Sequence, residues 1–161
     1  MSSARSFHTV CQEEVYGEVK SMLGELSDEF FDDAEHCDFY LKYGTTVVEI
    51  SIEPYEEDNA VVEVLAYCVQ GVKATTELMR ELLRINAEVP MGAFSMVDGD
   101  IFFSHSFVGR DLQASQLLAS LNHVAATSDM YDEQIVARYG GETALERLRG
   151  WSRRTRRAEA R

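Results

Sequence analysis

The sequence predicts an α+β fold in which helices pack on an antiparallel sheet. Two observations carry this prediction. Strand-like stretches occur in consecutive groups, and the strand–helix–strand alternation of a parallel sheet is missing from the chain. The chain has 161 residues, 45% of them hydrophobic, which is enough for one domain with its own core. The expected order of elements is α-β-β-β-α-β-β-α.

The first half is predicted to contain one helix and three strands. Residues 11–26 form the helix, because apolar residues recur there on one stripe with a period near 3.6. Three stretches with apolar residues at every second position then predict strands over 36–43, 46–53 and 60–70. Pro54 is expected to end the second strand, since proline cannot donate to a central ladder.

The third predicted strand is apolar on both faces. Val62 and Val64 lie on one face, Val61 and Leu65 lie on the other, and only Glu63 breaks the pattern. A strand with one face in water does not have this composition, so we expect a further layer on its second face. This apolar surplus indicates a dimer interface or a peptide groove. The alternative is that the helices cover everything.

A helix and a hairpin are predicted next. Thr75 or Thr76 can cap the helix, which reaches about Glu88 and has a wide apolar arc. The dipeptide Asp98-Gly99 suits the positive φ angles of a type I′ turn. Because alternating apolar residues flank it, it predicts a hairpin whose second arm runs to about Phe107.

The chain is predicted to end in a long helix and a basic tail. Asp111 is expected to cap the helix, which reaches Tyr139 with a break near Ser128. Residues 1–145 are therefore expected to form a single domain. Residues 146–161 are expected to form a basic, flexible tail.

Charge is distributed unevenly between these two parts. Residues 1–145 hold 8 Lys and Arg against 26 Asp and Glu, whereas 146–161 hold 7 Arg against 2 Glu. An acidic body repels nucleic acid, so we expect no nucleic-acid partner for it. The tail, with Arg153-Arg-Thr-Arg-Arg157, is expected to be solvated. The alternatives are contact with RNA, with a membrane surface or with the acidic body itself.

Composition also bears on location. No stretch is apolar and long enough to predict a membrane span, and the N-terminal residues lack the apolar region of a signal peptide. Cys11, Cys37 and Cys68 form no Cys-x-x-Cys pair, and an odd count argues against a disulfide framework. We therefore expect a cytoplasmic protein in which Cys37 and Cys68 are core residues.

The sequence offers no pattern typical of catalysis. Walker, Gly-x-Ser-x-Gly and His-Glu-x-x-His motifs are missing, and the carboxylate clusters fall in predicted loops or on a wet helix face. His105 is expected to be a hydrogen-bonded structural residue. We therefore expect no enzyme, no cofactor and no metal. The remaining alternative is an enzyme or small-molecule sensor with a closed pocket, which a cluster of reactive residues, such as His105 with Cys68 and an acid, would favour.

One stretch resembles a known family. Residues 81–111 read ELLRINAEVPMGAFSMVDGDIFFSHSFVGRD. A helix ending in Leu-x-x-x-Asn, matched by Leu82 and Asn86, precedes a Gly-x-Phe strand, matched by Gly92 and Phe94. This pattern resembles the YbjN-like proteins, which share the fold of type III secretion chaperones such as CesT. The resemblance spans about residues 11–141 and implies a homodimer that holds an extended partner segment. It also implies a regulator of sensory or stress responses as an alternative role.

These observations together favour a non-enzymatic, chaperone-like protein that binds a peptide or protein partner on a dimeric scaffold. The alternative is a regulatory or scaffold domain that only dimerises. The partner would bind by β-augmentation or in pockets on the sheet and first helix. The residues expected at the peptide-binding or dimer surface are Val15, Val19, Tyr40, Val47, Leu65 and Tyr67.

Overall fold

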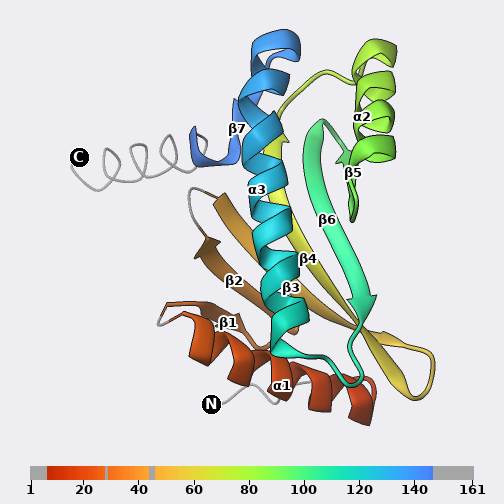
Figure 1. The fold of residues 1–161 in the computed structure, drawn as a ribbon, viewed down its shortest axis with the longest axis vertical. Coiled ribbons are helices and arrows are strands. Elements are labelled where there is room, and N and C mark those ends of the chain that lie inside the picture. Colours follow the sequence, from red (N-terminus) through yellow and green to blue (C-terminus); the bar gives the residue numbers. More distant parts are fainter. Residues whose placement is uncertain (1–6, 28, 44–45, 147–161) are drawn as a thin grey trace.

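The computed structural model describes residues 7–27, 29–43 and 46–146, and it has the predicted α+β architecture (Figure 1). The helices are α1 (Val10–Leu26), α2 (Thr76–Glu88) and α3 (Ala114–Tyr139). The strands are β1 (Phe31–Asp33), β2 (Asp38–Tyr43), β3 (Thr46–Tyr55), β4 (Asn59–Gln70), β5 (Ala93–Val97), β6 (Asp100–Val108) and β7 (Glu142–Thr143). The predicted elements are confirmed in the predicted order, and the short strands β1 and β7 are additions to it.

All seven strands belong to one antiparallel sheet. Six of them follow the order β1-β2-β3-β4-β6-β5. The short strand β7 pairs with Val69 and Gln70 at the end of β4, beyond the point where β3 stops. The long strand β4 is therefore the centre of the sheet, bonded to β3 on one side and to β6 on the other.

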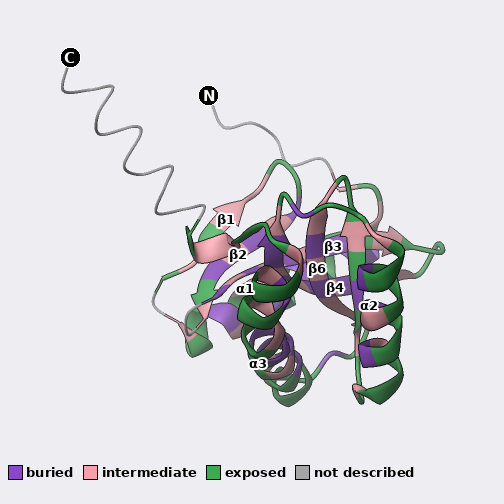
Figure 2. Cartoon of the chain, turned by 90° about the horizontal axis from the view of Figure 1, so that it is seen from above, coloured by how far each residue is buried: buried purple, intermediate pink, exposed green. Residues whose placement is uncertain are grey.

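The three helices lie on the same side of this sheet. In Figures 1 and 2, α1 and α3 cross the central strands, and α2 lies beside α3 at the β5 end. The hydrophobic core fills the space between the helices and the sheet. Alternate residues of β3 and β4, such as Ile50 and Val64, are 0% exposed there. The apolar stripe of α1 enters the same core through Val15 and Val19.

Local sequence signals explain most element boundaries. The Thr75 side chain accepts a hydrogen bond from the backbone N–H of Leu78, which confirms it as the cap of α2. Asp98 and Gly99 have φ angles of 51° and 89°, as a type I′ hairpin turn requires.

The prediction that Pro54 ends the strand β3 is wrong. The strand continues to Tyr55, and Pro54 pairs with Ala60 of β4. The backbone N–H of Ile52 donates to Cys37 on the β2 side of the strand. The nitrogen of Pro54 faces that same side two residues later, where β2 no longer runs alongside β3. The missing donor therefore breaks no ladder bond.

The long helix α3 also differs from prediction at two points. Asp111 does not cap it but lies in a turn with a φ angle of 61°. The helix begins at Ala114, where the side chain of Gln116 accepts a hydrogen bond from the N–H of the cap residue Gln113 at 2.9 Å. No break occurs near Ser128, because the helix contains no glycine or proline and Ser128 itself packs into the core.

The Leu-x-x-x-Asn and Gly-x-Phe motifs meet at the edge of the sheet. The Asn86 side chain accepts from the N–H of Phe94 at 2.7 Å and donates to its C=O at 3.0 Å. The Asn86 side chain thus connects α2 to β5 and satisfies both backbone groups of Phe94, as a residue of a neighbouring strand would. Gly92 precedes this contact with a φ angle of 76°, and a Cβ there would lie 2.5 Å from the Ser104 carbonyl oxygen. Both motifs therefore hold the edge strand β5 in place, the first against α2 and the second against β6.

Gly92→Ala should lower the free energy of unfolding by about 1–3 kcal/mol, because the new methyl group meets backbone in a left-handed conformation. Gly17→Ala is the matched control. Gly17 lies within α1 with open space around its Cα, so the same change should raise stability by about 0.5–1 kcal/mol. Urea unfolding followed by circular dichroism measures both. Equal effects of the two changes would contradict this interpretation of Gly92.

Candidate binding surface

The second face of the sheet carries none of the described helices. The outward residues of the central strands therefore pack only against one another and the solvent (Figure 2). On β4 these are Val61, Glu63, Leu65 and Tyr67, all of them half-buried. We call this side of the sheet the open face. The helices do not cover both faces, so the apolar surplus of β4 remains at the surface of the chain.

Five side chains form a continuous stripe across the open face. The ring of Tyr67 lies 5.2 Å from that of Phe102 on β6, and its hydroxyl donates to Glu49 on β3 at 2.6 Å. Glu49 is paired in register with Tyr40 on β2, whose ring lies 6.4 Å from that of Phe31 on β1. This open-face stripe consists of Phe31, Tyr40, Glu49, Tyr67 and Phe102.

Four of the six residues expected at the binding surface lie on this face. Tyr40 and Tyr67 belong to the stripe itself. Val47 and Leu65 flank it, since Val47 is paired with Lys42 of β2 and Leu65 with Glu49 of β3. All four are half-buried, so a partner can reach them.

The other two expected residues are placed elsewhere. Val15 is 2% exposed and Val19 is 0% exposed. Both point from α1 into the core, because the apolar stripe of this helix packs against the sheet. They stabilise the fold and are not accessible on the surface of this chain, so they do not belong to the open face.

Carboxylates surround the stripe. Next to it, Asp33 is paired with Asp38, and Asp38 is paired with Ser51, which is paired in turn with Glu63. Glu53 lies one step further along β3. Lys42 is a cation on this face, and His36 lies 3.0 Å from Asp33, which raises the pKa of His36. Carboxylates still outnumber cations, so the charge of this surface is negative.

The crowding of carboxylates affects their ionisation. Partial burial raises the pKa of Asp38 above its ordinary value, a hydrogen bond from Ser51 opposes the shift, and the charges of Glu49 and Asp33 add to it. The ionised face is thus under mutual repulsion, which a cationic partner would relieve.

The two stripe tyrosines are hydrogen-bond donors at neutral pH. Burial, followed by the negative charge of Glu49, raises the pKa of Tyr40 to about 12. Burial, followed by its hydrogen bond to Glu49, raises the pKa of Tyr67 further. The carboxylate of Glu49 is therefore held in place between aromatic rings. Such a surface can pack against apolar side chains and accept hydrogen bonds from cationic ones.

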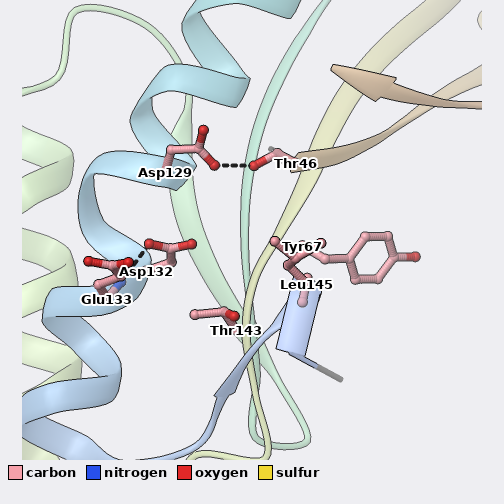
Figure 3. A pocket seen from close by; sticks show the side chains of 8 residues that line it. Thr46, Tyr67, Asp129, Asp132, Glu133, Thr143 and Leu145 are labelled. Atoms are coloured by element: carbon pink, nitrogen blue, oxygen red, sulfur yellow. Dashed lines mark hydrogen bonds between the residues drawn. The ribbon is translucent and has the colours of Figure 1, made fainter. Parts of the chain in front are cut away.

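A cavity of about 190 Å³ adjoins Tyr67, the stripe residue on β4 (Figure 3). It is lined by Thr46, Tyr67, Asp129, Asp132, Glu133, Thr143, Ala144 and Leu145. The hydroxyl of Thr46 donates to Asp129 across it. Burial raises the pKa of Asp132, and the neighbouring acids Asp129 and Glu133 add to the shift. The three acids belong to α3, on the helical side of the sheet, and the ring of Tyr67 points away from them (Figure 3).

A second apolar surface lies on α2. Met79 is 45% exposed and Leu83 is 68% exposed, one helical turn apart. A cavity of about 420 Å³ opens where the end of α2 meets α3, with Val89, Met130 and Tyr131 in its lining. The broad apolar arc expected of this helix is therefore present, and the part of it that faces away from the core is uncovered.

The residues singled out for chemistry do not meet. His105 lies on the core side, 2.9 Å from the Ser120 hydroxyl, and burial lowers its pKa. Cys68 lies four positions beyond Val64, the strand partner of His105, and its thiol donates to the Ser128 carbonyl at 3.6 Å. Burial raises the pKa of this thiol to about 12. Within the described ranges, His, Cys, Asp and Glu form no group of three or more suited to a metal ion.

Three members of the stripe were missed in the sequence. Phe31 belongs to a strand of three residues, too short to show an alternating pattern. Phe102 is the outward neighbour of the core residue Phe103, so the alternation of the hairpin already assigned it to this face. Glu49 was identified as outward, but its pairing with two tyrosines depends on the strand register, which the sequence does not reveal. Among the helices of the described chain, none is long and apolar enough to cross a bilayer.

The chain matches the family described as T3SS (YopN, CesT) and YbjN peptide-binding chaperone 1, TY-Chap1, over residues 10–147. No curated protein matches the sequence. Among solved structures, a chain of the HopA1–SchA chaperone–effector complex aligns with a TM-score of 0.59 at 9% identity, covering 77% of this chain and 98% of that one. A chain of the ExsC–ExsE complex aligns with a TM-score of 0.57 at 14% identity, covering 78% and 95%.

The fold and the family match thus define the class of the protein as a chaperone-type α+β scaffold. The protein belongs to the T3SS and YbjN peptide-binding chaperone family, which confirms the resemblance seen in residues 81–111. The solved structures establish the shared fold at low identity.

Asp38→Asn should raise the melting temperature at pH 7. Both folded and unfolded chains carry ionised Asp38 at that pH, and only the folded chain has the penalty that raises its pKa. As the pH falls through the raised pKa toward 3.8, Asp38 takes up a proton and the gain disappears. Calorimetry over pH 3–7 measures the difference. Asp58→Asn, in an exposed turn, is the control; a gain from Asp38→Asn that does not depend on pH would contradict the assignment.

Proposed function

We propose that this chain is a non-enzymatic, chaperone-like protein that holds an extended segment of a partner protein on the open face of its sheet. It does so as a cytoplasmic homodimer. The observation that carries the proposal is the open-face stripe: aromatic rings and a fixed carboxylate lie across five strands on a side that the helices leave bare. Membership of a peptide-binding chaperone family supports the same role.

The face is a better site for the partner than the outer edge of β5. An added strand needs free backbone groups along an edge. On β5, the side chain of Asn86 already bonds to both the N–H and the C=O of Phe94. This interaction protects the edge from pairing with another strand. A partner segment is therefore expected to lie across the open face, where its side chains contact the stripe and its cationic groups meet the carboxylates.

The second apolar surface supports dimerisation. Met79 and Leu83 are large, exposed and adjacent on α2, a helix on the side of the sheet opposite the open face (Figure 2). Exposed apolar side chains grouped in this way are typical of interfaces between copies. Two copies joined through α2 would each keep an open face for a partner. Dimerisation and partner binding would then depend on different residues.

Leu65→Lys should weaken partner binding about 30-fold or more, because it places a charge at the centre of the proposed contact. The fold should persist, since Leu65 points away from the core. A partner captured by the tagged chain is divided into overlapping synthetic peptides, and the binding peptide is titrated by fluorescence anisotropy. Leu83→Lys on α2 is the control and should bind as the wild type does. Equal affinity of all three proteins would contradict the assignment of the open face.

Leu83→Lys should convert the dimer to a monomer, because the side chain is 68% exposed in one chain and would be buried between two. Light scattering over a range of concentrations measures the mass. Leu65→Lys should remain dimeric. A wild-type chain that is monomeric throughout, or dissociation caused by Leu65→Lys alone, would show that α2 is not the interface.

A further inference from the structure

The basic residues at the end of the sequence have no place in the function proposed above. Residues 147–161 hold seven Arg, one Glu and the single tryptophan of the chain, Trp151. They lie outside the described residues. Their composition is the opposite of the rest of the chain, which carries 8 Lys and Arg against 27 Asp and Glu.

The described chain ends beside the open-face stripe. Strand β7 pairs with Val69 and Gln70 of β4 and takes the place that β3 leaves free. Leu145, which follows β7, lines the same cavity as Tyr67 (Figure 3). Tyr67 is in turn a member of the stripe. The described chain therefore ends near the β4 part of the stripe.

Charge and apolar character on the open face complement this segment. The face carries five carboxylates; Lys42 lies among them, and His36 is paired with one of them, Asp33, at 3.0 Å. The five are Asp33, Asp38, Glu49, Glu53 and Glu63. Opposite charges at short range attract even near a surface, and a cluster of one sign raises the local concentration of the other. The rings of Tyr67 and Phe102 provide an apolar place for an indole.

The length of the segment matches the distances involved. Six residues separate Leu145 from Trp151, and an extended chain of that length spans at most about 20 Å. The stripe crosses five neighbouring strands, which amounts to about 19 Å at the usual strand spacing. The row containing Asp38 and Glu63 lies two residues along the strands from Tyr40 and Glu49, about 7 Å, and four residues from Tyr67, about 13 Å. Trp151 can thus reach the stripe while the arginines that follow it reach the carboxylates.

We propose that residues 147–161 bind the open face of the same chain, with Trp151 on the aromatic stripe and the arginines on its carboxylates. The segment is then an internal occupant of the surface. If the open face is also the partner site, as the function proposed above requires, then a partner must displace residues 147–161 to bind. The face would be shielded while no partner is present, because a tethered segment has a high effective concentration.

Trp151 fluorescence tests this docking in the full-length protein without any partner. Because the chain has one tryptophan, its emission reports on this segment alone. In the native protein the emission should lie at shorter wavelength than in urea, and acrylamide should quench it several-fold less. Replacing Arg153, Arg154, Arg156 and Arg157 by Gln should shift the emission toward that of the unfolded chain. This variant changes no described residue, so it leaves the folded part intact.

A matched pair of charge reversals locates the docking surface. Glu53→Lys with Glu63→Lys reverses two charges on the open face and should release Trp151 to solvent. Glu13→Lys with Glu14→Lys reverses two charges on the exposed side of α1 and should leave the emission unchanged. Circular dichroism establishes that both variants are folded. Native emission equal to that in urea, or release by the α1 pair alone, would overturn the proposal.

Dilution distinguishes docking of the segment on its own chain from docking on a second copy. The protection of Trp151 should stay constant over a hundredfold range of protein concentration. Protection that is lost on dilution would show that the occupant comes from another copy and would overturn the proposal as stated. None of these measurements requires a partner, so their failure would leave the peptide-binding proposal to its own test.

Discussion

All three described helices pack on one face of the sheet, although its central strand β4 is apolar on both faces. The rest of the molecule follows from this asymmetry. The core between helices and sheet contains the residues that are 0% exposed, such as Val64 and Phe103. The opposite face retains side chains whose burial would be favourable but which no described helix covers. Large apolar side chains in such a position usually mark a surface that another chain covers. The proposed binding of a partner depends on this exposed face.

The chemistry of the open face limits what can cover it. Glu49 is fixed by the Tyr67 hydroxyl at 2.6 Å, so its negative charge is held in place among aromatic rings. The carboxylates around the stripe repel one another. The pKa of Asp38 is raised because the group is partly buried and because Glu49 and Asp33 lie near it. An apolar partner alone would bury these charges unpaired, at a high cost in desolvation. A segment that combines apolar or aromatic residues with arginine satisfies both the rings and the carboxylates.

Much of this arrangement could be predicted from the sequence, and the remainder could not for identifiable reasons. Period-two and period-3.6 patterns located the main strands and helices, and Thr75 and Asp98-Gly99 marked two boundaries with specific chemistry. The apolar residues on both faces of β4 indicated a dimer interface or a peptide groove. Periodicity alone did not show that the stripe of α1 would face the core, which removed Val15 and Val19 from the candidate surface. The Glu49–Tyr67 contact depends on strand register, and a sequence pattern does not fix register between distant strands.

The central claim is that the open face, and not the helical side, contacts the segment that this protein holds. Photo-crosslinking tests it most directly, with a benzophenone-bearing residue replacing either Phe102 on the open face or Val10, which is 73% exposed on α1. Mass spectrometry then identifies the crosslinked residues in the full-length protein, with and without its captured partner. The account predicts that position 102 crosslinks to residues 147–161 or to the partner and that position 10 does not. Crosslinks from position 10 alone would contradict it and would move the binding surface to the helical side.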